Sequence, residues 1–390
     1  MRLSPPPLSL YIHFPWCVRK CPYCDFNSHP VQGDLPEQQY VEALLLDLTQ
    51  DLEWIEKERV RYPGPLHSLF LGGGTPSLFS PESIDRLLSG IRALLPWPPD
   101  IEITLEANPS TVESNKFRAF RDLGINRLSL GVQSFQEPKL KALGRIHSAR
   151  EAEAAIETAK EAGFTNLNVD LMFGLPRQSL NDALYDVITA LRHAPTHISF
   201  YQLTLEPNTI FAKYPPSLPD EDTVWEIGQT GQEKLELAGF QRYEISAYAQ
   251  EGYQCQHNLN YWRFGDYLGL GAGAHGKLTD AQRGRIWRYF KIRHPGHYLQ
   301  KAKTPERIGG RVLIAERERP LEFLLNALRL KEGFSPGQFE CCTGLPFSLV
   351  EPVLDALLAE NLLYQQNGRI ACTPLGWNFL DSVLERFIGL

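Results

Sequence analysis

Residues 11–24 read YIHFPWCVRKCPYC, and this stretch decides how the rest of the chain is interpreted. Its first residues continue an apolar run that begins at position 8 and is typical of a buried β-strand. Three cysteines follow in the spacing C-x3-C-x2-C, at Cys17, Cys21 and Cys24, and no fourth cysteine completes the set. A strand that leads directly into a loop with three soft ligands predicts a metal centre at the carboxyl end of that strand.

Composition places the chain in a broad class. It has 390 residues, 43% of them hydrophobic, which is enough for a large core and excludes general disorder. The formal net charge of −7 argues against a general nucleic-acid binder. The start of the sequence lacks the features of a signal peptide, and no apolar run is long enough for a membrane span, so we expect a cytoplasmic protein. In a reducing compartment, clustered cysteines favour a metal over disulfides.

Strands and helices alternate over the first half of the chain. Expected strands lie at residues 8–14, 67–74, 100–109, 125–135, 165–176 and 196–207, with helices between them, including 36–59, 81–95, 110–124 and 179–193. This alternation predicts an α/β fold with a parallel sheet and right-handed crossovers. Six such units are enough for a partial (β/α)6 barrel.

Polar or glycine-rich segments follow five of these strands. They are the cysteine loop, GGGTP at 72–76, EANP at 106–109, QSF at 133–135 and DLMFGLP at 170–176. Ligand sites of parallel α/β folds gather at the carboxyl ends of the strands. We therefore expect all five segments to face one cavity.

The later part of the chain predicts further units. We expect a core at residues 1–210, a region at 211–300 that completes the barrel, and a C-terminal winged-helix-like α+β domain at 301–390, with a hairpin turn at Asn367–Gly368. Residues 320–390 contain four Lys or Arg and eight Asp or Glu, so phosphate attraction is absent. This charge favours a lid or a partner-docking module over DNA binding.

The chemistry of three thiolates leaves two kinds of site open. Zinc takes four protein ligands in a structural site, or three and a water in a catalytic one. Iron–sulfur clusters usually take four thiolates, so three would leave one iron free for a substrate with an amine and a carboxylate. The tight loop and the soft ligands favour the cluster.

The same stretch resembles the signature of the radical S-adenosylmethionine (SAM) enzymes. The nearest pattern is that of the oxygen-independent coproporphyrinogen III oxidase family, and within it the haem chaperone branch. The resemblance covers nearly the whole chain and implies a radical SAM barrel with a [4Fe-4S] cluster on Cys17, Cys21 and Cys24. It also implies that SAM binds the open iron, and it leaves open whether SAM is cleaved in normal function.

The resemblance also assigns SAM contacts. The implied residues are Tyr11, Tyr23, Gly73, Gly74, Thr75, Glu106, Gln133, Arg145 and Asp170. Their chemistry suits the ligand, because glycines allow close backbone approach and arginine offers a fork to a carboxylate. The two oxygens of Asp170 suit a ribose diol. For each residue taken alone, an ordinary structural role is the alternative.

Two features separate chaperone from oxidase. The oxidase pattern has a further cysteine two residues after the third, where this chain has Phe26. The H-N-x-x-Y pattern at His257, Asn258 and Tyr261 resembles the haem motif of the chaperone branch, and neutral imidazole is a common haem ligand. A histidine that is hydrogen-bonded in a loop, beside a tyrosine packed in the core, is the plain alternative. Cys255, Cys341, Cys342 and Cys372 receive no role.

The leading hypothesis is therefore a haem chaperone that passes haem to membrane respiratory proteins. Its expected partners are haem, SAM, a one-electron donor protein and a membrane client that it contacts peripherally, and the oligomeric state is open, a homodimer included. One alternative is the oxidase, which converts coproporphyrinogen III to protoporphyrinogen IX. Another is a regulatory winged-helix protein whose cluster senses redox state. Whether the chain is an enzyme stays open.

Overall fold

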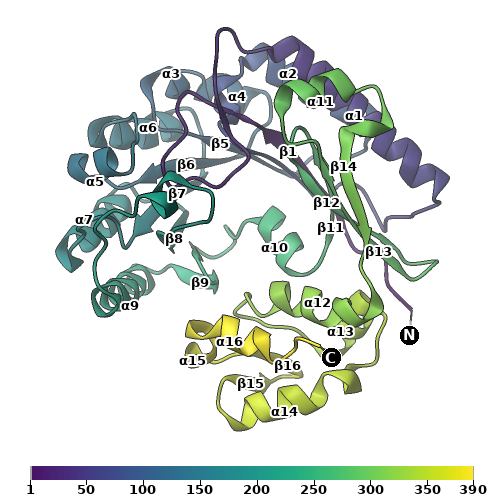
Figure 1. Cartoon of the computed structure of the whole chain (residues 1–390). Helices are drawn as coiled ribbons and strands as arrows, with labels where there is room; N and C mark the ends of the chain where they lie inside the picture. The colour runs from purple at the N-terminus through teal and green to yellow at the C-terminus, as the bar shows by residue number, and fades with distance from the viewer. Residues whose placement is uncertain (1, 390) are drawn as a thin grey trace.

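A computed structural model describes residues 2–389, within which twelve strands form one curved sheet in the order β14-β13-β12-β11-β1-β4-β5-β6-β7-β8-β10-β9 (Figure 1). Its central part is parallel, and β11 also runs parallel to β1. The parallel strands are β1 (Leu8–Phe14), β4 (Ser68–Gly73), β5 (Glu102–Ala107), β6 (Arg127–Gln133), β7 (Asn166–Phe173), β8 (His197–Gln202) and β11 (Asp266–Leu270). The expected α/β fold with a partial (β/α)6 barrel is confirmed.

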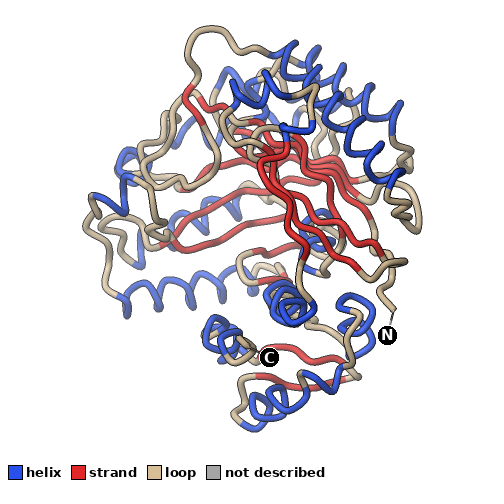
Figure 2. Tube along the Cα trace, turned by 45° about the vertical axis from the view of Figure 1, so that its right-hand side comes forward, coloured by secondary structure: helices blue, strands red, loops and turns tan. Residues whose placement is uncertain are grey.

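Helices connect the parallel strands and cover the outer face of the sheet (Figure 2). They are α1 (Glu37–Lys57), α2 (Pro81–Leu94), α3 (Thr111–Ser114), α4 (Phe117–Asp122), α5 (Glu137–Ala142), α6 (Ala149–Glu161) and α7 (Leu180–Arg192). Local sequence sets where several of them begin. Ser148 and Ser179 each form a capping box with the acid three residues on, which satisfies free N–H groups of the first turn. The expected helix at 110–124 is divided into α3 and α4.

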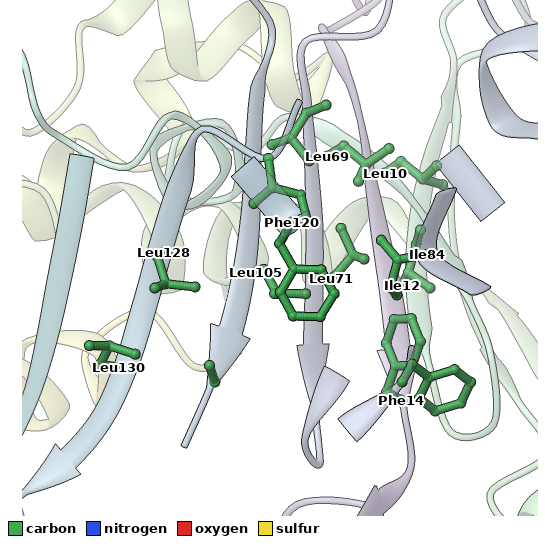
Figure 3. Packing of buried hydrophobic residues seen from close by; sticks show 14 of the residues in the cluster. Leu10, Ile12, Phe14, Leu69, Leu71, Ile84, Leu105, Phe120, Leu128 and Leu130 are labelled. Atoms are coloured by element: carbon green, nitrogen blue, oxygen red, sulfur yellow. The ribbon is translucent and has the colours of Figure 1, made fainter. Parts of the chain in front are cut away.

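Alternation along the strands separates an apolar outer face from a polar inner face. Figure 3 shows outward side chains from four neighbouring strands packed with Ile84 and Phe120 of the covering helices. They are Leu10, Ile12, Phe14, Leu69, Leu71, Leu105, Leu128 and Leu130, all fully buried. Because successive strand residues point to opposite faces, the intervening residues point inward. Those residues include Tyr11, Glu106, Ser129 and Asp170, so the sheet presents polar chemistry to its hollow.

Antiparallel strands extend the sheet at both edges. On one side lie β12 (His275–Asp280), β13 (Arg285–Lys291) and β14 (Ile308–Leu313), and on the other β10 (Ala247–Ala249) and β9 (Gln241–Glu244). The sheet therefore continues to Leu313, so its last strand lies within residues 301–390, which we assigned to the C-terminal domain. The sequence IGGRVL of β14 has no clear alternation because this edge strand is largely exposed.

The C-terminal unit has its own core below the barrel (Figure 1). It contains α12 (Arg319–Ala327), α13 (Pro336–Thr343), α14 (Glu351–Ala359), β15 (Leu363–Gln366), β16 (Arg369–Cys372), α15 (Pro374–Asn378) and α16 (Leu380–Glu385). Strands β15 and β16 form the expected hairpin. Asn367 and Gly368 both have positive φ, as a type I′ turn requires.

The other α-helices and strands lie outside the central parallel part of the sheet. They are β2 (Trp16–Cys17), β3 (His29–Pro30), α8 (Ile210–Lys213), α9 (Glu221–Leu237), α10 (Gln256–Trp262) and α11 (Pro295–Lys301). Helix α10 contacts β4, β11 and α12, so it lies between the hollow of the sheet and the C-terminal unit (Figure 1). In the described part of the chain, no helix combines the length and the apolar character needed to cross a membrane.

Candidate cofactor site

The carboxyl ends of the parallel strands surround a cavity of about 420 Å³. All but one of the residues expected to bind the cluster or SAM line it, namely Cys17, Cys21, Tyr23, Cys24, Gly73, Gly74, Thr75, Glu106, Gln133, Arg145 and Asp170. The exception is Tyr11, which lies deeper along β1. His257 and Tyr261, expected to contact haem, also lie elsewhere. The structure thus brings the cysteine loop and the strand-end residues together, as parallel topology predicts.

Each cysteine sulfur of the loop has a polar neighbour. Thr75 Oγ1 donates to Cys17 Sγ at 3.4 Å, Arg145 Nη1 lies 3.8 Å from Cys21 Sγ, and Cys24 Sγ lies 3.6 Å from Ser28 Oγ. Burial raises the pKa of Cys17 to about 11, so metal binding at this thiol must release a proton. Within residues 2–389, no three His, Cys, Asp or Glu side chains converge on a single metal ion.

The glycine segment at the end of β4, residues 72–74, lies beside the cysteine loop. A Cβ on Gly74 would lie 2.6 Å from the carbonyl oxygen of Trp16 and 2.7 Å from that of Phe14. Gly73 has φ +106°, and a Cβ there would meet the His13 ring at 2.5 Å. Only glycine therefore allows this backbone to approach the strand that precedes the cysteines.

Two carboxyl groups face the cavity from neighbouring regions of the inner face. Glu106 Oε2 accepts from Gly73 N at 3.0 Å, and Asp170 Oδ1 accepts from Asn168 Nδ2 at 2.7 Å. Burial, with repulsion from Asp170, raises the pKa of Glu106 to about 8. Burial also raises the pKa of Asp170. Asp170 also accepts from Ser129 Oγ at 3.4 Å, and burial outweighs these hydrogen bonds. A ligand with an ammonium and hydroxyls would add further donors to both carboxyls.

Arg145 and Gln133 close the opposite side of the cavity. Arg145 Nη2 donates to Asn108 Oδ1 at 2.7 Å and to Gly131 O at 2.6 Å, whereas its Nε is buried without a partner among the described residues. Burial alone would lower the pKa of this guanidinium, but Tyr23 and Cys21 raise it, so it stays charged. Gln133 has φ +70° at a bulge of β6, and its Oε1 accepts from Tyr201 Oη at 2.8 Å.

Sequence reasoning missed two asparagines that organise this site. Asn108 bridges Arg145 and Thr75, because its Nδ2 also donates to Thr75 Oγ1 at 2.9 Å. Asn27 links the cysteine loop to segments that follow β11 and β13, since its Nδ2 donates to Ala272 O at 2.9 Å and to Arg293 O at 2.8 Å. Asn108 was visible as part of EANP after a strand. The partners of Asn27 lie about 250 positions away, and no local pattern marks them.

The two expected haem residues lie on α10, towards the amino ends of the strands. His257 is 8% exposed, and its Nδ1 lies 3.0 Å from Ser68 Oγ at the start of β4. Burial lowers the pKa of His257 to about 3, so the ring is neutral. Tyr261 is half-buried, with its ring 5.1 Å from that of Tyr267. Tyr11 lies between the two regions, with its ring 6.2 Å from that of His257.

The residues of the cavity fit a cluster and SAM. Three thiols, the glycine segment, two buried carboxyls and Arg145, whose buried Nε has no partner within residues 2–389, all line the same cavity. Soft ligands suit iron–sulfur chemistry, and the carboxyls suit an ammonium and a diol.

Comparison with known proteins gives the family. Residues 11–187 match the model of the radical SAM superfamily, and residues 314–379 match that of the HemN C-terminal domain. The Heme chaperone HemW of Haemophilus influenzae is 50% identical over 388 residues, which are 98% of each chain. This chain belongs to the HemW family of haem chaperones. A second HemW relative, from Escherichia coli, is 49% identical and covers 98% of this chain and 99% of its own.

A solved structure shows the same fold as this member of the HemW family. The coproporphyrinogen III oxidase HemN of Escherichia coli, described as a radical SAM enzyme, superposes with a TM-score of 0.83. The match covers 100% of this chain and 91% of that one at 22% identity. At this identity the likeness shows the fold, so it supports the barrel and the smaller C-terminal domain.

Proposed function

We propose that this chain holds a [4Fe-4S] cluster on Cys17, Cys21 and Cys24, binds SAM in the adjacent cavity, and carries haem on α10 for delivery to membrane respiratory proteins. The observation behind the proposal is the convergence of three cysteines and two carboxyls on one cavity, in a member of the HemW family. The proposal requires two protein partners, a one-electron donor and a haem-requiring client.

The chain's own residues would position SAM. Glu106 accepts a hydrogen bond from Gly73 N and would accept further ones from the ammonium group of SAM. Asp170 would accept from the ribose hydroxyls. Arg145 offers its charge next to Cys21 and suits the carboxylate. When bound, the cluster supplies one-electron chemistry and an open iron, and SAM supplies the sulfonium.

The geometry of His257 suits a haem ligand. Its Nδ1 bonds Ser68 Oγ, and its Nε2 has no hydrogen-bond partner within residues 2–389. When Nδ1 donates to Ser68, Nε2 carries the lone pair that haem iron needs. The rings of Tyr11 and Phe70 lie beside the imidazole at centroid distances of 6.2 and 5.0 Å and give an apolar, aromatic surrounding.

Haem titration tests the proposal. Wild-type protein, His257→Ala and Tyr261→Phe are titrated with haem and followed by absorption spectra, with His297→Ala as the control because that histidine is exposed on α11. We expect stoichiometric binding by wild type and control, and affinity at least about tenfold weaker in His257→Ala. Absence of a stoichiometric haem spectrum in wild type, or an unchanged affinity in His257→Ala, contradicts the proposal.

The oxidase hypothesis has a separate test. Phe26, which stands where the oxidase pattern has a cysteine, is 59% exposed at the rim of the cavity and cannot do thiol chemistry. We therefore expect no conversion of coproporphyrinogen III by anaerobic, reconstituted protein with SAM and a reductant. Formation of protoporphyrinogen IX would replace the chaperone proposal with the oxidase.

A further inference from the structure

A continuous chain of hydrogen bonds crosses the inside of the barrel, from the cavity to α10. At the cavity end, Asn168 Nδ2 donates to Asp170 Oδ1 at 2.7 Å. Asn168 Oδ1 lies 2.6 Å from His197 Nδ1, and His197 Nε2 lies 2.9 Å from Tyr243 Oη. At the other end, the backbone N–H of Cys255 donates to Tyr243 Oη at 3.3 Å. Cys255 is the N-cap of α10, two residues before His257.

Every link in this chain has a defined direction. The amide nitrogen of Asn168 faces the carboxylate, so its oxygen accepts from His197 Nδ1–H. Burial lowers the pKa of His197 well below its ordinary value, so the ring is neutral and Nε2 accepts from the hydroxyl of Tyr243. The tyrosine oxygen then has its lone pairs for the N–H of Cys255. A change of charge or partner at Asp170 therefore alters each later bond.

Burial makes these bonds expensive to lose. Asn168 is 2% exposed, His197 1% and Tyr243 5%, so water has little access to replace a missing partner. Ser129 and Ser199 also bond the Asn168 side chain, at 2.8 and 3.1 Å, and hold the amide in one orientation. Because a buried polar group costs free energy unless it is hydrogen-bonded, the column depends on each of these bonds.

The row of hydrogen bonds ends at the part of α10 that holds the proposed haem ligand. Glu102, at the start of β5, accepts from the backbone N–H groups of Gln256 and His257, each at 3.0 Å. Tyr243 and Glu102 together hold the first turn of α10 against the sheet. A shift of Tyr243 therefore moves the backbone that carries the His257 imidazole.

We propose that this row of hydrogen bonds couples ligand binding at Asp170 to haem binding on α10, with His197 and Tyr243 as positioning residues. The inference rests on the proposed function for the identity of both ligands. A ligand whose hydroxyls donate to Asp170 lowers the pKa that burial raises, and so favours the charged carboxylate that accepts from Asn168 Nδ2. SAM then orders the start of α10 and tightens haem binding, and by linkage haem tightens SAM binding to the same extent.

The test uses Tyr243→Phe, which removes one hydroxyl and keeps the ring. Tyr248→Phe on β10 is the matched control, because Tyr248 is also buried but its hydroxyl has no hydrogen bond within the described residues. Amide hydrogen exchange of α10 is measured by mass spectrometry on cluster-reconstituted, unreduced protein, with and without SAM. We expect SAM to slow exchange in α10 of wild type and Tyr248→Phe, and to leave it unchanged in Tyr243→Phe.

Haem affinity gives the second readout. In wild type and control we expect saturating SAM to tighten haem binding about fivefold or more. In Tyr243→Phe we expect the same haem affinity with and without SAM. A role in stability alone would change haem affinity equally with and without SAM. If Tyr243→Phe does not fold, Cys255→Pro takes its place, because it removes the last N–H donor at a φ of −66° that proline accepts. Its control is Cys255→Ala, which keeps the N–H and removes only the thiol that lies 3.6 Å from Glu102 Oε1.

The outcomes separate this inference from the proposed function. If wild type binds no haem but SAM still protects α10, the chaperone proposal fails, whereas the link from Asp170 to α10 stands without haem as its second ligand. If haem binds and neither its affinity nor α10 exchange responds to SAM, the coupling is wrong and the chaperone proposal stands. Equal responses in wild type and Tyr243→Phe also contradict the coupling.

Discussion

The raised pKa of Glu106 predicts a pH-dependent stability that Glu106→Gln should remove. Burial raises the pKa of this carboxyl from 4.5 to about 8, with a further contribution from Asp170. Between these two values the folded protein holds a proton that the unfolded chain has lost. Wild-type stability therefore falls as pH rises from 4.5 to 8, and it changes no further through this group above 8. Glutamine has no charge to desolvate and still offers an oxygen to Gly73 N.

The size of the effect follows from the pKa difference. Full linkage gives about 1.4 kcal/mol per pH unit, or about 4.8 kcal/mol over the whole interval. Because Glu106 borders a cavity, water lowers the desolvation cost, and we expect about half of that value. The free energy of unfolding of Glu106→Gln relative to wild type should therefore rise by about 2 kcal/mol between pH 5.5 and pH 8.5.

Urea unfolding of protein without cluster or SAM, at pH 5.5, 7.0 and 8.5, measures this difference. Glu53→Gln is the control, since Glu53 is exposed on α1 and should show no such trend. A difference between Glu106→Gln and wild type that stays constant with pH would refute the reasoning. A difference that shrinks as pH rises would show a lowered pKa in place of a raised one.

Three further substitutions test other parts of the account. Gly74→Ala places a Cβ 2.6 Å from Trp16 O, so we expect less iron bound after reconstitution, with a folded far-UV spectrum, and normal iron content would contradict this. Ser68→Ala removes the partner of His257 Nδ1, so haem affinity should fall about tenfold in titrations where exposed Ser89→Ala has no effect, and an equal affinity would contradict it. Lys291→Met leaves Asp47 and Asp51 without their buried lysine, whose Nζ lies 2.7 Å from Asp51 Oδ2. The free energy of unfolding in urea should therefore fall by about 3–5 kcal/mol, and a fall of under about 1 kcal/mol would refute this.

The sequence predicted those parts of the molecule that local patterns determine. Apolar runs closed by glycine or proline located six of the seven parallel strands, all but β11, and parallel topology then placed the strand-end residues, from the cysteine loop to Asp170, around one cavity. The Asn367–Gly368 hairpin followed from turn chemistry.

Contacts between residues far apart in the sequence could not be predicted from local patterns. The edge strand β14 is mostly exposed, so its residues lack the alternation that reveals a buried strand. Asn27 binds backbone oxygens that follow β11 and β13, and His257 is placed by Ser68 of β4 and Glu102 of β5. Such positions follow from the assembled sheet, as does the polar column through His197, whose residues come from β7, β8, β9 and the start of α10.

The most direct test of the account is Mössbauer spectroscopy of anaerobically reconstituted protein, with and without SAM. The account predicts a [4Fe-4S] cluster in which one iron site changes on addition of SAM while the other three do not. Cys24→Ala should lose this cluster, and Cys342→Ala, outside the cavity, should keep it. Zinc in place of iron, or a cluster in which no iron site responds to SAM, would contradict the claim that Cys17, Cys21 and Cys24 leave one iron open.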